Sequence, residues 1–244
     1  MGSAGTEFEV ADVISASRMN QKTLFVGTGA QIEALSTTYA GMYAYCTSAG
    51  GTKLADTLYQ RNAANSAWVA WSVVGKQDIF IPASAMWGRT TSAAGGLTKV
   101  ETATNKINYQ VWEFDSASVE YVQFSWIPPR NYNNGTVKFT FYWTNAAGLS
   151  TETVDWNVAG VAISNDDPLE VAMGTAITTT DTWIAQNDVH ISSQSSAVTI
   201  GGTPADSDFI MFEISRKVST DNMTGDARLL GVVLEYSIDS GIAA

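Results

Sequence analysis

Alternating apolar and polar residues predict that most of this chain forms β-strands. From 137 to 143 every second residue is Val, Phe or Trp, and the residues between them are polar or amphipathic. Residues 121–126 repeat this two-residue period, which places one strand face on a core and the other toward solvent or a neighbour. The pattern predicts eight strands, at 78–83, 106–115, 119–127, 136–144, 152–164, 188–200, 208–218 and 227–238.

Two segments depart from the pattern. Within 152–164 the apolar positions change phase next to Gly160, which predicts a β-bulge at the glycine. The segment 166–174, DDPLEVAMG, has acidic residues and Pro at its start and Gly at its end. That order is typical of a short helix.

These elements predict an all-β protein with three parts. Strands joined by loops of unequal length predict a two-sheet antiparallel, jelly-roll-like sandwich over 76–244. Residues 24–75 carry shorter apolar stretches and predict a small β-hairpin module for docking or assembly, with a tight turn at 61–65. Residues 1–23 predict an arm with a short helix, because Thr6 and Glu9 fit a capping box.

Composition narrows the classes of partner. Apolar residues make up 45% of the 244 positions and charged residues 15%, which allows a large core. A net charge of −11 excludes a general nucleic-acid surface. No apolar run approaches the roughly 20 residues of a membrane span, and the N-terminus predicts no signal peptide. The single Cys46 excludes an intrachain disulfide and indicates synthesis in a reducing cytoplasm.

Candidate catalytic residues are few. His190 is the only histidine, so any histidine-based triad would pass through it. Its place opposite Val189 and Ile191 predicts an exposed or edge-strand side chain instead. Two pairs of carboxylates stand two residues apart, as candidates for glycoside hydrolysis or simply as solvated strand faces: Glu113 with Asp115, and Asp206 with Asp208.

Metal and phosphate sites are equally weakly indicated. An oxygen-rich loop has side chains of the type that bind calcium but lacks the full calcium-loop pattern, so Asx-turns are favoured: Asp221, Asn222, Thr224 and Asp226. GTGAQ at 27–31 and GGTPAD at 201–206 lack the lysine of a phosphate loop and predict turns. The sequence therefore predicts no catalytic centre, no metal and no cofactor.

Four loop residues are candidates for contacts with another subunit. Trp87 and Arg89 either make such a contact, or plug the end of the sandwich and cap a carboxylate, respectively. Arg130 and Tyr132 follow two prolines that end a strand, and they either pack the end of the hairpin or touch a neighbour. Most other tryptophans share strand faces with Phe and are expected in the core.

Two motifs carry a family resemblance. IFIPASAMWGRTT at 79–91 and DARLLGVVLEY at 226–236 bracket a region that resembles a domain common in tailed phages. That domain opens with (I/V)PA-x-AMW-x-RTT and ends with D-x-RLLG-x-x-(I/L)-x-Y, and the resemblance covers 78–238. GMYAYCT at 41–47 and DTLYQRNAANSAWV at 56–69 are similar to the small hairpin units of phage fibres.

The resemblance implies a non-enzymatic virion structural protein, assembled in the host cytoplasm. The first expectation is a capsid decoration or cement protein on the outside of a tailed-phage-like head. The alternative is a tail or head fibre, or receptor-binding subunit, with a carbohydrate-binding sandwich. The implied partners are further copies of the chain, as a trimer, and the major capsid protein or other virion proteins, with no nucleic acid and no membrane. A glycosidase or lyase acting on surface polysaccharide is the third hypothesis. The family pattern supplies no catalytic residue.

Overall fold

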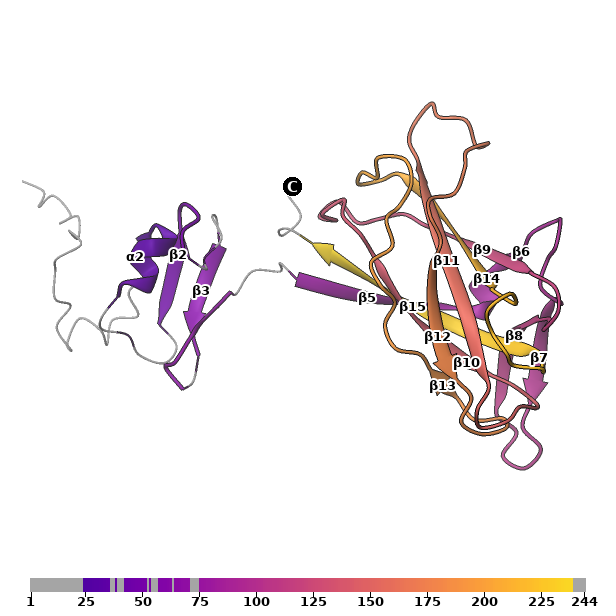
Figure 1. The fold of residues 1–244 in the computed structure, drawn as a ribbon. Helices are drawn as coiled ribbons and strands as arrows, with labels where there is room; N and C mark the ends of the chain where they lie inside the picture. Colours follow the sequence, from indigo (N-terminus) through magenta and orange to yellow (C-terminus); the bar gives the residue numbers. More distant parts are fainter. Residues whose placement is uncertain are drawn as a thin grey trace, which may run out of the picture. The chain divides into compact units, whose positions relative to one another are not determined.

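The chain forms two compact units, Met1–Val74 and Gly75–Ala244 (Figure 1). The computed structural model describes residues 24–35, 38, 42–51, 53, 57–62, 64–70 and 75–238. The helix predicted within 1–23 lies outside these residues.

The first unit is a small sheet with one helical turn and a half beside it. The sheet order is β1 (Phe25–Gly27), β2 (Tyr43–Cys46), β3 (Thr57–Arg61) and β4 (Trp68–Ala70), with β1 parallel to β2 and the other pairs antiparallel. Helix α2 (Gly29–Glu33) packs on it, and the small buried core consists of Ile32, Ala44, Cys46 and Tyr59.

Local hydrogen bonds shape both connections of this unit. The tight turn predicted at 61–65 is confirmed, because Asn65 has φ +52° and its Oδ1 accepts a hydrogen bond from Arg61 Nε at 3.0 Å. The turn predicted at 27–31 is wrong, since this segment starts α2. The Thr28 side chain accepts from the Gln31 N–H and the Gln31 side chain accepts from the Thr28 N–H, a complete capping box.

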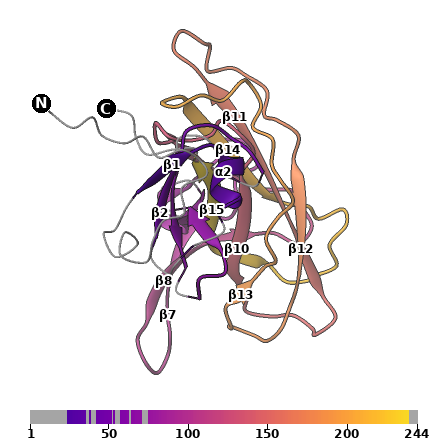
Figure 2. The same cartoon turned by 90° about the vertical axis from the view of Figure 1, so that its left-hand side faces the viewer.

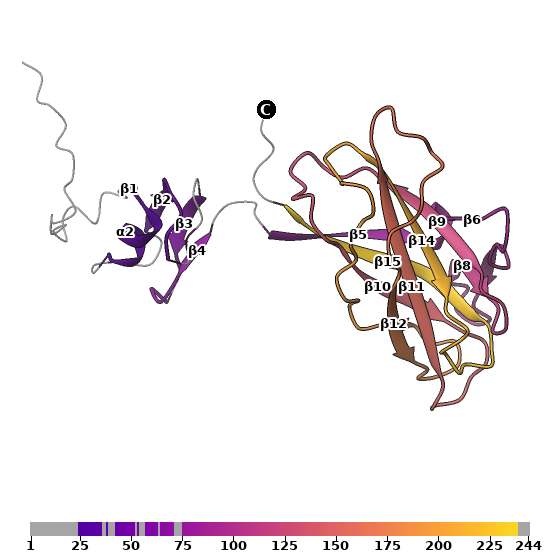
Figure 3. The ribbon, with the colours of Figure 1, turned by 45° about the horizontal axis from the view of Figure 1, so that its top comes forward.

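The second unit is a sandwich of two antiparallel sheets, as predicted. One sheet has the order β13-β10-β15-β8-β7, with β5 also paired to β15, and the other has the order β12-β11-β14-β9-β6 (Figure 3). Its elements are β5 (Gly75–Pro82), the 3-10 turn η1 (Ala83–Ala85), β6 (Trp87–Gly88), β7 (Leu97–Glu101), β8 (Asn108–Phe114), β9 (Tyr121–Trp126), β10 (Lys138–Thr144), β11 (Thr153–Ile163), β12 (Ile177–Thr182), β13 (His190–Ile191), β14 (Phe209–Arg216) and β15 (Ala227–Ile238).

Aromatic side chains from both sheets fill the space between them. Trp156 of β11 stacks on Phe141 of β10, with ring centroids 5.7 Å apart and planes at 9°. Phe212 of β14 stacks on Phe124 of β9 at 5.2 Å. The alternating apolar residues of the sequence therefore form the core of the sandwich. Each such ring buries a large apolar area, which makes these pairs its main packing contacts.

The bulge predicted at Gly160 is wrong. β11 stays in register with β14 from Trp156 to Ile163. The apolar pattern changes phase because β11 is buried on both faces in this stretch. The Gly160 carbonyl accepts from the N–H groups of Gly174 and Gly201, so two loops cover this part of the strand. A register shift is found elsewhere, between β10 and β15 at Tyr142 and Trp143.

The helix predicted at 166–174 is also wrong. The segment runs as turns and extended chain. Its apolar residues bury little surface, since Leu169 is 78% exposed and Val171 is 45% exposed. A helix this short without a packed apolar face is not stable in water, which explains the difference.

The strand predicted over 188–200 is regular only at His190–Ile191. Beyond Ile191 the chain still runs alongside β10, but serine hydroxyls, in place of backbone carbonyls, accept the hydrogen bonds from N–H groups of β10. Ser192 Oγ accepts from Phe141 N and Ser195 Oγ accepts from Phe139 N, each at 2.9 Å. The other seven predicted strands are confirmed to within a few residues.

Candidate functional site

Strand β15 changes its partner along one edge. It pairs with β8 at Ala227–Leu229 and with β5 at Gly231–Ile238, so the two partners lie toward opposite ends of β15 (Figure 1). Residues 108–110 of β8 pair only with β7, and Figure 2 shows the β7–β8 hairpin projecting from the sandwich. The edge of the sheet therefore forks at Leu230.

Phe80 is held at this fork by a glycine. Pro82 pairs with Gly231, and the Phe80 ring lies over the glycine. A Cβ added to Gly231 would lie 2.7 Å from the Phe80 ring and 2.6 Å from the Ile81 carbonyl oxygen. The ring also meets Tyr142 edge-on at 5.9 Å. Phe80 is thus fixed in place although 51% of it is exposed.

A hollow of about 590 Å³ occupies the fork, and we call it the fork hollow. One wall comes from the end of β5 and from η1, through Phe80, Pro82, Ala83 and Ser84. The other wall comes from the β7–β8 hairpin, through Lys99, Asn108, Tyr109 and Gln110, and Leu230 completes the lining.

The lining combines aromatic rings with planar amides. Phe80 and Tyr109 offer ring surfaces, Gln110 offers an amide donor and acceptor, and Asn108 offers its amide oxygen. The amide of Asn108 is positioned from its own hairpin, because Nδ2 donates to the Lys106 carbonyl at 2.9 Å and to Glu101 Oε2 at 3.3 Å. No carboxylate and no histidine line the hollow. This chemistry suits a neutral or weakly charged ligand with hydroxyl groups and apolar faces.

Trp87 and Arg89 lie on the outer face of the other sheet. Trp87 pairs with Gln123 and is 44% exposed, so the expectation that it plugs the sandwich is wrong. The reason is that β6 is an edge strand of only two residues. Arg89 does cap a carboxylate, with Nη1 3.3 Å from Glu213 Oε2, and its guanidinium also lies 4.1 Å from the Tyr121 ring centroid.

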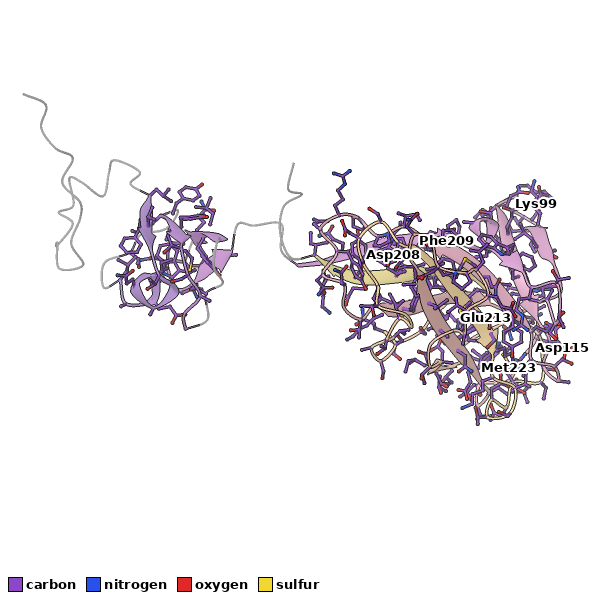
Figure 4. The ribbon with its side chains drawn as sticks, turned by 90° about the horizontal axis from the view of Figure 1, so that it is seen from above. Lys99, Asp115, Asp208, Phe209, Glu213 and Met223 are labelled. Atoms are coloured by element: carbon purple, nitrogen blue, oxygen red, sulfur yellow. The ribbon has the colours of Figure 1, made fainter. Side chains whose placement is uncertain are left out.

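This second surface is defined as the Trp87 face, formed by Trp87, Arg89, Tyr121, Gln123 and Glu213. Gln123 Nε2 donates to Glu213 Oε2 at 2.8 Å, so the polar side chains support one another. Figure 4 places Glu213 toward the middle of the sandwich and Lys99 at its margin. The contact predicted for Trp87 and Arg89 with another subunit stays a prediction.

Tyr132 packs the end of its hairpin. It is 4% exposed, its ring meets Trp126 at 5.2 Å, and its hydroxyl donates to the Gly135 carbonyl. A contact with a neighbouring subunit is therefore wrong for Tyr132. Arg130 is exposed and has no hydrogen bond or ion pair with any residue of the part that the structure describes. Its contact role stays a prediction.

Burial raises the pKa of Tyr132 to about 12. The folded state therefore holds the phenol proton after the unfolded chain, whose phenols ionise near pH 10, has lost it. The free energy of unfolding should be unaffected by this group below about pH 10 and fall between about pH 10 and 12. Urea unfolding across this range should show that the free energy of unfolding falls less with pH for Tyr132→Phe than for the unchanged chain. Tyr109→Phe keeps Tyr132, so its free energy of unfolding should fall as much as that of the unchanged chain. An equal dependence on pH for all three chains would contradict the prediction.

His190 is buried, which corrects the expectation of an exposed side chain. It does lie on an edge strand, β13, where it stacks on Trp143 with centroids 4.2 Å apart. Its Nε2 accepts from the Ile184 N–H at 2.9 Å. The ring is buried because its strand neighbour across the pair is Trp143, an inward residue of β10.

Three of the four paired carboxylates, Glu113, Asp115 and Asp208, have structural partners. Glu113 accepts from Arg228 Nε at 2.8 Å, and Asp208 accepts from the Ala205 N–H. Asp115 accepts from the N–H groups of Ala117 and Ser118, and these bonds lower the pKa of its carboxyl. None of these contacts joins two carboxylates across a cleft.

The oxygen-rich loop at 221–226 serves a buried cation instead of a metal. Arg216 is fully buried, and its Nε and Nη2 lie 2.6 and 3.0 Å from the two carboxylate oxygens of Asp221. Its remaining N–H groups donate to the carbonyls of Phe114, Met223 and Gly225. Within the described part of the chain, no three His, Cys, Asp or Glu side chains are grouped as metal ligands would be.

The fork hollow was not predicted from the sequence. Its aromatic residues, Phe80 and Tyr109, lie within predicted strands, and in the sequence they look like any other aromatic residue of a strand. One signal was present: the two family motifs contain Pro82 and Gly231, which pair at the fork.

Comparison with known proteins concerns the sandwich. No protein-family profile and no curated protein matches the chain. A carbohydrate-binding module specific for non-crystalline cellulose is 18% identical, over 61% of this chain and 85% of its own, with a TM-score of 0.36. A Paenibacillus glucanotransferase complexed with cycloisomaltoheptaose is 12% identical, over 60% and 17%, with a TM-score of 0.33. The enzymatically active domain of bacteriophage CBA120 tailspike protein 4 is 9% identical, over 66% and 19%, with a TM-score of 0.32.

The chain thus spans less than a fifth of the two larger proteins. These likenesses concern architecture and carry no argument about what the chain binds. None of the helices in the described residues has the length and apolar character to cross a membrane.

Proposed function

We propose that this chain is a non-enzymatic fibre or receptor-binding subunit of a tailed-phage particle, and that its sandwich binds carbohydrate in the fork hollow. The virion setting is supported by the two phage-like motifs. The carbohydrate ligand is supported by the lining of the hollow, which is the observation that carries the proposal.

Saccharides combine apolar C–H faces with many hydroxyl groups. The rings of Phe80 and Tyr109 suit the first, and the amides of Asn108 and Gln110 suit the second. Phe80 is held in place by Gly231 and Tyr142, so binding needs little ordering of this ring.

A binding role is favoured over hydrolysis of the ligand. Glycoside hydrolysis by the common mechanisms uses two carboxylates about 5–9.5 Å apart at the scissile bond. The hollow is lined by none.

Replacing Tyr109 with Ala should weaken carbohydrate binding by about tenfold or more, because it removes one ring surface from the hollow. The measurement is a glycan array followed by calorimetry on the best ligand. Trp87→Ala is the matched control, since it removes an exposed aromatic ring from the opposite sheet and should leave this affinity unchanged. The proposal would be contradicted if Tyr109→Ala bound the ligand as tightly as the unchanged chain. It would also be contradicted if the unchanged chain bound no glycan on the array.

A capsid decoration role is the second candidate, and the Trp87 face favours it. Trp and Arg are the residues that most often dominate protein interfaces, and here Arg89 is fixed by Glu213 and Tyr121 beside an exposed Trp87. In this role the chain would associate as a trimer and bind the major capsid protein. Trp87→Ala would then reduce self-association or capsid binding in sedimentation assays, while Tyr109→Ala would not.

A further inference from the structure

The fork hollow contains one cation, Lys99. Lys99 lies on β7 directly opposite Gln110 of β8, so the ammonium and the amide come from paired positions of the same hairpin. Both side chains are exposed and line the hollow. Figure 4 shows Lys99 at the margin of the sandwich.

The carboxylates nearest in the strands already have partners. Glu101, two residues along β7, lies 3.4 Å from Lys106 Nζ and accepts a hydrogen bond from Asn108 Nδ2 at 3.3 Å, so it lies directly behind a residue of the hollow. Glu113 of β8 accepts from Arg228 Nε at 2.8 Å. Among the described residues, Lys99 has no carboxylate within ion-pair distance. Its charge is therefore not neutralised from within the sandwich.

The net charge of −11 does not cancel this local charge. At physiological ionic strength, interactions between exposed charges are largely screened beyond about 8 Å. A ligand inside the hollow would therefore meet the charge of Lys99 first, since Lys99 is the charged side chain that lines the hollow, while the carboxylate of Glu101 behind Asn108 is paired with Lys106.

From these observations we infer that the fork hollow takes an acidic saccharide with a ring carboxylate, and that Lys99 binds this carboxylate next to Gln110. The inference rests on the proposed carbohydrate-binding function and adds the class of saccharide. A carboxylate fits better than a phosphate, because phosphate sites usually gather several donors from Arg or from successive backbone N–H groups, and this hollow has a single ammonium.

The test compares acidic oligosaccharides with their carboxyl-reduced counterparts, which are neutral but otherwise alike. The probes are oligogalacturonate, oligoalginate, hyaluronan oligosaccharides and sialyllactose, each measured by calorimetry with the full chain. The chain should bind at least one acidic probe about tenfold more tightly than its reduced form, the size of one charge-assisted hydrogen bond. That preference should shrink as salt is raised.

Lys99→Gln should abolish the preference, so that the acidic probe and its reduced form bind with equal affinity, and Lys99→Arg should preserve the preference. Lys138→Gln, which removes a lysine from β10 outside the hollow, is the control and should leave the preference intact. Equal binding of acidic and reduced forms, or a preference that survives Lys99→Gln, would overturn the inference but leave carbohydrate binding standing. If the chain bound only neutral glycans, the inference of an acidic ligand would likewise fail while carbohydrate binding would stand. If no probe and no neutral glycan binds, the proposed function itself fails.

Discussion

Replacing Asp221 with Asn is expected to lower the free energy of unfolding of the sandwich by about 3–5 kcal/mol. Arg216 and Asp221 are 0% and 2% exposed, so the substitution leaves a guanidinium charge in the interior without its counter-charge. The three backbone carbonyls that also accept from Arg216 carry only partial charges and do not replace the carboxylate. Urea unfolding followed by near-ultraviolet circular dichroism measures the loss.

The pair of Arg228 and Glu113, which is only partly buried, supplies the control for that experiment. Their side chains are 24% and 29% exposed, and their Nε–Oε1 distance of 2.8 Å is close to that of the buried pair. Because solvent screens this pair, Glu113→Gln should cost at most about 1 kcal/mol. Similar losses for the two variants would show that burial does not govern the strength of these ion pairs.

Gly231→Ala is expected to have the second largest effect, with a loss of about 1–3 kcal/mol in stability. The added Cβ would lie 2.6 Å from the Ile81 carbonyl oxygen and 2.7 Å from the Phe80 ring, so the backbone of β5 must move and the ring must leave its place. Displacing Phe80 should also weaken ligand binding in the fork hollow. The two measurements are urea unfolding and calorimetry with the best oligosaccharide.

Gly75→Ala is a closely matched control for this substitution. Gly75 has the same φ of +156° and lies in the same strand pair, yet a Cβ there would meet nothing within 4 Å. Gly75→Ala therefore carries the same backbone strain as Gly231→Ala without the close contacts, so it should cost clearly less stability than Gly231→Ala. If both alanine variants lose the same stability, the close approach of Phe80 and Ile81 is not what requires glycine at 231.

Alternation alone was enough to predict the core of the sandwich. β15 was predicted at its observed limits, 227–238, because its inward residues are uniformly apolar. β12 was missed because two of its inward positions are Thr179 and Asp181. Asp181 accepts a hydrogen bond from Trp143 Nε1 at 2.7 Å, so a polar residue on this strand packs against the core. With polar residues at inward positions, the strand lacks the alternation of apolar and polar residues from which strands are predicted.

The candidate site was harder to predict for a different reason. Trp87 and Arg89 were recognised because they stand in a loop-like motif without an obvious core role. Phe80 and Tyr109 looked like ordinary strand residues, and what exposes them is the change of partner along β15. Which strand pairs with β15 depends on contacts between residues far apart in the sequence, so it cannot be predicted from the short segments around Phe80 and Tyr109.

The serine-bonded segment after β13 also bears on how copies of this protein can associate. An ordinary edge strand presents a row of unpaired N–H and C=O groups that can template a neighbouring chain. Here the N–H groups of Phe139 and Phe141 are taken by hydroxyls, and the irregular chain that supplies them offers no continuous ladder on its far side. This edge is therefore protected against pairing with the edge strand of another copy, which is a common start of aggregation.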